Sequence, residues 1–422
     1  MRERWVWWWT GGALALMVRV AWLSTLPTAA LVPIDSTESS QQTAPADSLD
    51  SASDSWSAQA TTPQSERKIL YHSDSVNWKY LVQPVLAQSQ SLSMDNYLPL
   101  SRLVEGWQAL LQAFACAGVT ALAWQAFASR VLAGTALLLS AMQPLWLLRL
   151  SVVDDVALMQ CLVSNWLLVV AHTARQGGVF GSILLGGLAG LILLIRPGTL
   201  LAVILVLVWS LWQLRQATRG WLASLIVVLA LANFLGTWSV RHWWNTGEPT
   251  PFAAIFWQYQ YAGLPSSAVR PQIASDFSWQ EAAHAVTTAW RESLRECLAH
   301  RLTLWGQMLI PENWTDLLGD SSALGAQLDT YLPLVQLLLA VAVLLGWRWS
   351  FGWYREHRPI TVVAFGFPLA YAWGTIAGVR EGFSLAEPVF LLYAALGIAG
   401  AIPWLSKRLL PKQFLALPEA AP

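Results

Sequence analysis

Charged side chains are scarce in this sequence. Asp, Glu, Lys and Arg make up only 12% of its 422 residues, roughly half the share of a typical soluble domain. The charges also balance, because 25 Lys and Arg face 25 Asp and Glu, so there is no basic excess to attract nucleic acid. Nucleic acid is therefore excluded as a main partner, and most of the chain is predicted to lie outside water.

Cysteines and nucleotide-binding motifs are also few or absent. The three cysteines, Cys116, Cys161 and Cys297, show no CxxC or CxxH spacing, so neither a disulfide framework nor a zinc site is predicted. We expect them to be small packing residues. The chain has no P-loop, Rossmann glycine fingerprint, GxSxG or HExxH motif. A nucleotide-sugar donor therefore has no support.

Long apolar runs dominate what the sequence does contain. Hydrophobic residues make up 55% of the chain. Its 27 Trp are typical of a membrane protein, because Trp rings are enriched at the level of the bilayer headgroups. A span needs about twenty apolar residues, so we predict an all-α polytopic membrane helical bundle, a single domain over 1–422 with about ten transmembrane helices. The predicted spans are 5–26, 104–127, 131–148, 155–172, 178–195, 198–213, 221–238, 328–347, 360–378 and 388–405.

The basic residues between these spans predict the orientation. Short segments on one side hold only three acids, Glu3, Glu356 and Glu419, beside a larger basic set, so that side and both termini are expected to be cytoplasmic. The basic set is Arg2, Arg4, Arg130, Arg175, Arg215, Arg219, Arg348, Arg355, Arg358, Lys407, Arg408 and Lys412. The outer loops are short of cysteine and have one glycosylation sequon, at Asn313, which favours a bacterial inner (plasma) membrane.

The first span has a second interpretation as a cleaved secretory signal. Basic residues precede its apolar stretch, and small residues follow near a suitable cleavage point. However, Arg19 interrupts the apolar run, and the run is long for a signal peptide. A retained transmembrane helix is the favoured interpretation.

Two extracytoplasmic loops are large. The first, 27–103, begins with a Ser/Thr/Ala/Asp tract at 36–66 that is too polar to fold alone. An apolar face at helical spacing then predicts an amphipathic surface helix over 69–92. In the second loop, 239–327, a capping box and an apolar stripe predict one amphipathic helix over 278–309, packed on the bundle without chemistry.

Five segments combine charged or aromatic residues with the ends of predicted helices. They are SDSVNWKYLVQPVLAQSQSL (73–92), LSVVDDVALMQCLVSNWLLVVAHTARQGG (150–178), GGLAGLILLIRPGTLLAVILVLVW (186–209), GTWSVRHWWNTGEPTPFAAIFWQYQYAGLP (236–265) and VREGFSLAEPVFLLYAALGIAGAI (379–402). In this order they resemble the GT-C class of membrane glycosyltransferases, in the branch of protein O-mannosyltransferases and lipid A aminoarabinose transferases. The resemblance implies a GT-C-like fold and transfer of a sugar, with inversion, from a polyprenyl-phosphate carrier to an extracytoplasmic acceptor protein, lipid or glycan.

The resemblance also implies acidic groups at the outer surface. Asp74 matches the first acidic position and is the preferred general base for the acceptor hydroxyl, with Asp35 as the alternative; either could instead be a helix N-cap or a solvated loop residue. Asp154 and Asp155 match a second acidic site that orients the acceptor or binds a divalent cation such as Mg²⁺ or Mn²⁺. They could also simply cap a helix. No cofactor or metal is required, because the chain has no DxD motif and no histidine cluster.

Three arginines are candidates for binding the phosphate of the lipid carrier. Arg196 lies between two apolar runs beside Pro197, where an uncompensated charge would be costly. Arg241 and Arg380 stand at predicted outer helix ends. A guanidinium fork suits a departing phosphate, although each side chain could instead reach the headgroups of membrane lipid.

A second class of function stays open. The chain could be a non-catalytic scaffold or assembly subunit derived from this fold, or a transporter of lipid-linked saccharides. A transporter more often places charged groups in mid-membrane, whereas the acids here gather at the outer rim. The sequence therefore favours the glycosyltransferase.

Overall fold

The computed structural model is all-helical in the part of the chain that it describes. That part comprises residues 2–25, 97–143, 146–147, 156–176, 178–216, 220–246, 257, 261, 264, 279–307, 323–350, 360 and 379–401. Within it there are eleven α-helices, one 3-10 helix and no strand. Among the described residues, four stretches are long and apolar enough to cross a membrane: Glu105–Phe127, Val156–Thr173, Gly220–Arg241 and Pro333–Ser350. A helical membrane protein is thus supported, while the count of about ten spans stays a prediction.

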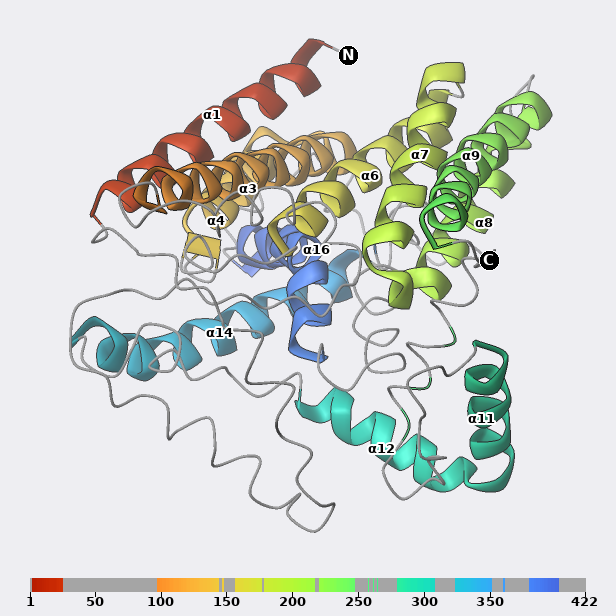
Figure 1. Cartoon of the computed structure of the whole chain (residues 1–422). Coiled ribbons are helices and arrows are strands. Elements are labelled where there is room, and N and C mark those ends of the chain that lie inside the picture. The colour runs from red at the N-terminus through yellow and green to blue at the C-terminus, as the bar shows by residue number, and fades with distance from the viewer. Residues whose placement is uncertain are drawn as a thin grey trace, which may run out of the picture.

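The N-terminal helices α1 (Arg2–Thr25) and α3 (Tyr97–Phe127) lie side by side (Figure 1). They run antiparallel, because Trp7 stacks on Trp124 at 6.1 Å whereas Arg19, further along α1, reaches back to Gln112. Gly11 contributes to this packing, because a Cβ there would press on the side chain of Thr120. Small residues allow such close approach between membrane helices.

Helix α4 (Arg130–Ala141) follows α3 after a two-residue turn. Ala128 adopts φ 49°, a left-handed conformation that often ends a helix, and the Ser129 side chain then caps α4 by accepting from the Leu132 N–H at 3.4 Å. The predicted span 131–148 was too long, because α4 ends at Ala141. Its 12 residues rise about 18 Å.

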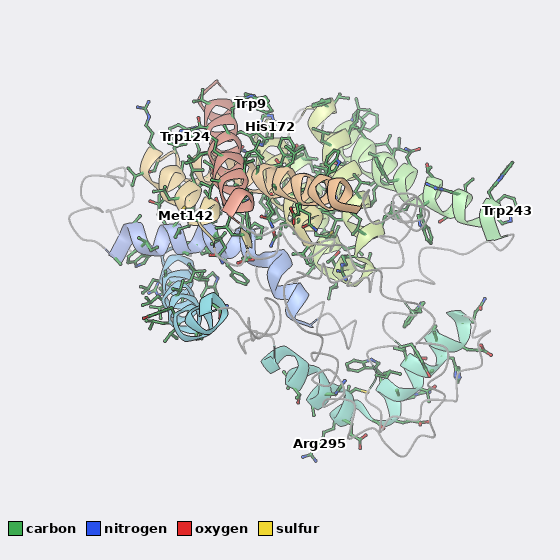
Figure 2. The ribbon with its side chains drawn as sticks, turned by 60° about the vertical axis from the view of Figure 1, so that its left-hand side comes forward. Trp9, Trp124, Met142, His172, Trp243 and Arg295 are labelled. Atoms are coloured by element: carbon green, nitrogen blue, oxygen red, sulfur yellow. The ribbon has the colours of Figure 1, made fainter. Side chains whose placement is uncertain are left out.

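The next helices are α6 (Val156–Gln176), α7 (Val179–Ile195), α8 (Leu200–Leu214) and α9 (Gly220–Thr246). A short 3-10 helix, η5 (Pro197–Thr199), joins α7 to α8. Helices α7 and α9 run parallel, because a Cβ on Gly186 would meet Val227 and one on Gly190 would meet Phe234. Much of α9 faces outward, and Trp243 near its end is 54% exposed (Figure 2), as expected for a lipid-facing surface.

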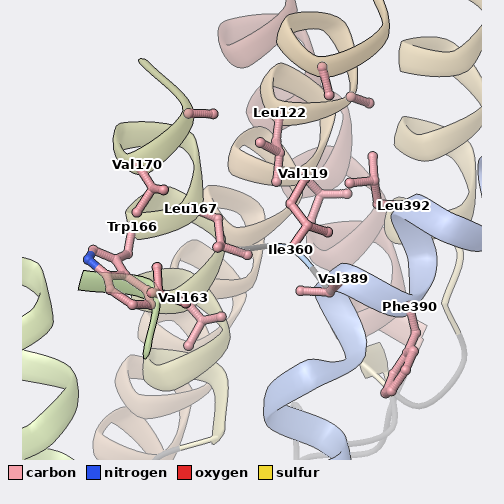
Figure 3. Packing of buried hydrophobic residues seen from close by; sticks show 14 of the residues in the cluster. Val119, Leu122, Val163, Trp166, Leu167, Val170, Ile360, Val389, Phe390 and Leu392 are labelled. Atoms are coloured by element: carbon pink, nitrogen blue, oxygen red, sulfur yellow. The ribbon is translucent and has the colours of Figure 1, made fainter. Parts of the chain in front are cut away.

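Helix α16 (Val379–Ala401) packs closely on the C-terminal part of α14 (Ala323–Ser350) and also contacts α4 and α6. Figure 3 shows where α3, α6 and α16 meet: Val119 and Leu122 of α3 lie near Leu392 of α16, with Ile360 between the helices. The main core therefore combines segments from both halves of the chain. Helix α16 is the last helix in the described part of the chain, and it contributes Val389, Leu392 and Leu396 to this core.

The amphipathic segment predicted as one helix over 278–309 is two helices, α11 (Trp279–Glu292) and α12 (Leu294–Gln307), which point in different directions (Figure 1). The kink at Ser293 brings Cys297 Sγ to 3.8 Å from the Ala289 carbonyl oxygen. Residues eight apart in a straight helix are separated by about 12 Å along its axis, so a single helix could not make this contact. The kink buries Cys297 with Ala282, Val286 and Ala289.

Candidate functional site

The residues predicted for the site are only partly described. Asp35, Asp74, Asp154 and Asp155 lie outside the described residues, as does the surface helix predicted over 69–92. Arg380 is in the first turn of α16, but its side chain is also outside the description. Arg196 and Arg241 are the two predicted site residues whose side chains the structure places.

Arg196 stands at the break that the sequence predicted between two apolar runs. Its backbone N–H caps α7 by donating to the Ile192 carbonyl at 2.9 Å. Its own carbonyl accepts from the Thr199 N–H at 3.0 Å and from the Thr199 hydroxyl at 2.8 Å, which closes the η5 turn. The side chain is only 3% exposed, and a cation at a helix C-terminus is favoured by the helix dipole.

Arg196 and Arg241 lie at the same end of the bundle. Since α7 and α9 run parallel, with residues 186 and 190 level with 227 and 234, the end of α7 lies beside the Arg241 region of α9. Arg241 is exposed whereas Arg196 is buried. The arrangement puts two positive charges at the end that the sequence predicts to be extracytoplasmic.

A buried carboxylate, Glu387 of α16, organises a polar centre that the sequence did not predict. Trp146 Nε1 donates to Glu387 Oε2 at 2.7 Å, and Gln160 Nε2 donates to the same oxygen at 3.3 Å. Gln143 Nε2 donates to Glu387 Oε1. Glu387 is 3% exposed. Three N–H donors thus face the Glu387 carboxylate, which in its ionised form can only accept hydrogen bonds. These hydrogen bonds offset much of the cost of burying a charge.

Arg19 is the cation of the same centre. Its guanidinium donates to Gln112 Oε1 at 2.9 Å, to the Ala15 carbonyl at 3.1 Å and to the Ser140 carbonyl at 3.4 Å. It also lies over the ring of Trp146, with Cζ 5.7 Å from the ring centroid. Arg19 is fully buried, so these acceptors and the aromatic face take the place of water.

Trp146 therefore stands between a guanidinium and a carboxylate. The negative face of its indole meets Arg19, and its polar N–H edge meets Glu387. The three side chains come from α1, the connection after α4, and α16. The polar atoms of these three side chains bind to one another. The arrangement therefore suits a structural role, in which it holds the three segments together.

The face of α3 that leads to this centre is polar as well. Glu105, Gln108 and Gln112 are buried and follow at spacings of three and four residues, so they share one side of the helix. All these polar groups lie in the C-terminal half of α1, the first half of α3, the end of α4 with the residues that follow it, and the first halves of α6 and α16. In the predicted orientation these ends are extracytoplasmic.

Sequence reasoning missed most of this centre, although two signals were present. In the sequence Arg19 interrupts the first apolar run, and Glu387 directly precedes the last predicted span, 388–405. An ionisable residue inside or at the edge of an apolar run is a functional candidate by default. Arg19 and Glu387 are two such residues. Trp146, Gln143 and Gln160 carry no such signal, because neutral side chains are unremarkable at helix ends.

No metal centre emerges from the described ranges: no three His, Cys, Asp or Glu side chains come together there. The acidic pair Asp154 and Asp155, for which the sequence left open acceptor orientation, cation binding or helix capping, directly precedes α6 and falls outside the described ranges. No protein-family model matches this chain, and comparison with curated proteins finds no relative.

Proposed function

We propose that this chain is an inverting glycosyltransferase that moves a sugar from a polyprenyl-phosphate carrier to an extracytoplasmic acceptor protein, lipid or glycan. The proposal rests on the order of the five motifs that resemble the GT-C class. The single structural observation that supports it is Arg196, buried at the α7–α8 break on the same end of the bundle as Arg241. A guanidinium fork suits the oxygens of a lipid phosphate.

The chemistry requires a base and an anion-binding group on opposite sides of the sugar. The acceptor oxygen forms a bond to the anomeric carbon while the bond from that carbon to the phosphate oxygen breaks. Asp74, or alternatively Asp35, takes the acceptor proton, and the electron pair leaves with the phosphate. Arg196, Arg241 and Arg380 are the groups proposed to stabilise the charge that develops on the phosphate.

Replacement of single carboxylates tests this proposal. Membranes containing the protein are supplied with labelled polyprenyl-phosphate sugar, and Asp74, Asp35, Asp154 and Asp155 are each changed to Asn. We expect one of Asp74→Asn and Asp35→Asn to reduce transfer by about 10²–10⁴-fold, as loss of a general base does. Asp54→Asn, in the polar tract 36–66, is the matched control. Transfer that survives all the replacements would remove the catalytic proposal.

The role of Asp154 and Asp155 is tested separately. If the pair binds a divalent cation, EDTA abolishes transfer and Mg²⁺ or Mn²⁺ restores it. If the pair orients the acceptor, EDTA has no effect, while Asp→Asn changes the KM for the acceptor. The two roles therefore predict opposite responses to chelation.

The second class of function is favoured by a different observation. Arg19 and Glu387 are buried inside the helical bundle, and charged groups within a bundle are typical of transporters and of scaffolds that use them to fix a structure. Proteoliposomes loaded with a fluorescent lipid-linked saccharide distinguish these functions. Movement of the intact lipid between leaflets without cleavage of the sugar–phosphate bond indicates a transporter, and neither movement nor cleavage indicates a scaffold.

A further inference from the structure

Helix α9 lies at one side of the bundle (Figure 1) and is long enough to cross a bilayer. Only 17% of its span is buried inside the molecule, against 72% of the α3 span. Trp221 and Trp243 are exposed near its two ends, a separation of about 33 Å along the axis, which is close to the roughly 30 Å of a hydrocarbon layer. Because Trp rings settle at the headgroups, these two side chains mark the two surfaces of the membrane.

Asn233 lies near the middle of this span. It is about 18 Å along the axis from Trp221 and about 15 Å from Trp243. Its side chain is exposed, and none of the described residues forms a hydrogen bond with its amide. Lipid tails can neither donate nor accept hydrogen bonds, and an amide left unsatisfied in hydrocarbon is costly. The position of Asn233 therefore favours a hydrogen-bonding partner on the outward side of α9.

The residues beside Asn233 allow another helix to approach closely. Ala232, Gly236 and Thr237 are also exposed, and spacings of three and four residues put them on one side of the helix. A Cβ on Gly236 would meet no atom within 4 Å. Ala and Gly four residues apart are typical of faces at which membrane helices pack, and Asn and Thr form hydrogen bonds across such faces.

A second copy of this chain fits the face better than an unrelated helix. All copies of a membrane protein share one orientation, so the Asn233 side chains of two copies lie at the same depth. An amide carries both donors and an acceptor, and two of them can therefore pair across a two-fold axis. No ionised side chain occurs on α9 from Trp221 to Val240, so identical faces meet there without charge repulsion.

We propose that the chain forms a parallel homodimer in the membrane through the α9 face, defined as Ala232, Asn233, Gly236 and Thr237, with the two Asn233 amides hydrogen-bonded to each other. The inference needs α9 to cross the bilayer, but it does not depend on which side is cytoplasmic. It is also independent of the proposed glycosyltransferase activity. The dimer can be measured without any substrate.

Energy transfer between labelled copies tests the dimer. In a variant without its native cysteines, a dye is attached at Gln216→Cys, in the exposed turn after α8. Donor-labelled and acceptor-labelled copies are reconstituted together in liposomes at decreasing ratios of protein to lipid. We expect Asn233→Leu to weaken association about tenfold, because it removes the hydrogen bonds between the helices while keeping the side-chain size.

A substitution at glycine tests the close approach. Gly236→Ile should weaken association by at least about tenfold, because a branched side chain holds the two helices apart. It should not disturb the single chain, since the space around Gly236 is open. Gly106→Ile in α3 is the matched control, because Gly106 is also exposed and a Cβ there also meets no atom within 4 Å. It should leave association unchanged.

Three results would overturn the homodimer. The parent protein could show no energy transfer beyond that of random mixing, both α9 substitutions could leave association unchanged, or Gly106→Ile could weaken it equally. If the parent is monomeric, slow reaction of Thr237→Cys with a lipid-soluble maleimide indicates that another protein or another segment of this chain covers the α9 face, and fast reaction indicates lipid. Sugar transfer measured in the same liposomes separates the two proposals, because association is recorded without it.

Discussion

At the scale of single residues, the central feature is a tryptophan that meets two charges through different parts of one ring. Arg19 lies over the indole face of Trp146, and the indole N–H donates to Glu387 at 2.7 Å. Burial of Arg19 or Glu387 alone would be costly. An intervening indole allows both to be buried in one centre, because its face attracts a cation and its edge donates to an anion.

Trp146→Phe tests the strength of the bond to Glu387. Trp166 offers a matched control, because it is also fully buried but donates to a neutral acceptor, the Leu185 carbonyl, at 3.1 Å. A bond to a charged group is about twice as strong as one to a neutral group. We expect Trp146→Phe to lower the free energy of unfolding, measured by SDS titration in mixed micelles, by about 1.5–3 kcal/mol and Trp166→Phe by about 0.5–1.5 kcal/mol. A larger loss for Trp166→Phe would contradict this account.

Arg19→Lys tests whether the planar fork matters in addition to the charge. The guanidinium uses separate nitrogens for Gln112, Ala15 and Ser140, and a lysine ammonium cannot reach all of them from one point. We expect a loss of about 1–3 kcal/mol in the free energy of unfolding. Arg295→Lys, at the exposed Arg295 of α12 (Figure 2), should change it by less than about 0.5 kcal/mol. Equal effects at the two positions would reject a specific role for the fork.

Arg196→Lys addresses the proposed phosphate contact. A guanidinium can hold two phosphate oxygens at once, whereas an ammonium binds as a point charge. Under the glycosyltransferase proposal, we expect the KM for the polyprenyl-phosphate sugar to rise about tenfold, with expression and folding preserved. Steady-state kinetics in proteoliposomes measures this. A normal KM would assign Arg196 to the capping of α7 alone.

At the scale of elements, helices meet through glycine. A Cβ on Gly397 of α16 would overlap the Ala342 carbonyl of α14, and one on Gly346 of α14 would overlap the Tyr393 carbonyl of α16. The two backbones are therefore in direct contact. Small residues have this role in membrane helices, where packing replaces the hydrophobic effect as the source of association.

Gly397→Ala should force α14 and α16 apart. Because the clash is with backbone, no side-chain rotation relieves it, and we expect a loss of about 1–3 kcal/mol in the free energy of unfolding. Gly134→Ala in α4 is the control, because a Cβ there meets no atom within 4 Å. Similar losses for the two variants would refute the close-contact explanation.

At the scale of the whole molecule, the polar ends of five helices define one end of the bundle. Arg196 and Arg241 join that end through the parallel run of α7 and α9. The predicted orientation places this end outside the cytoplasm. Orientation is therefore the property on which every proposal about the site depends.

Cysteine accessibility in intact cells tests this orientation. In a variant without its native cysteines, a cysteine placed beside Arg4 or beyond Lys412 should resist a membrane-impermeant maleimide, because both termini are predicted to be cytoplasmic. A cysteine at position 93 in the first large loop should react readily. Labelling after permeabilisation is the control for reactivity. The reverse pattern would place the site in the cytoplasm and remove the glycosyltransferase proposal.

The helices themselves could be predicted from local sequence. Apolar runs located α1, α3, α6, α7, α8, α9, α14 and α16 to within a few residues at most ends, and the Arg196–Pro197 pair predicted the break between α7 and α8. A run of apolar residues favours a membrane helix and a proline breaks one, and both effects are local in sequence. They can therefore be predicted without knowledge of distant contacts. The kink at Ser293 accompanies the packing of Cys297 against α11. The apolar stripe over 278–309 gives no sign of this contact, so it predicted one straight helix.

The sequence by itself determined the membrane character and the helical class, and it places Arg19 within an apolar run and Glu387 beside one, because hydropathy is additive along a chain. Only the tertiary structure decided that Glu387 binds Trp146, which is 241 residues away, and Gln143, which is 244 residues away. A neutral glutamine or tryptophan has many acceptable partners. The partner that such a side chain binds is set by which helices pack together. Close contacts at glycine and the shared core determine that packing.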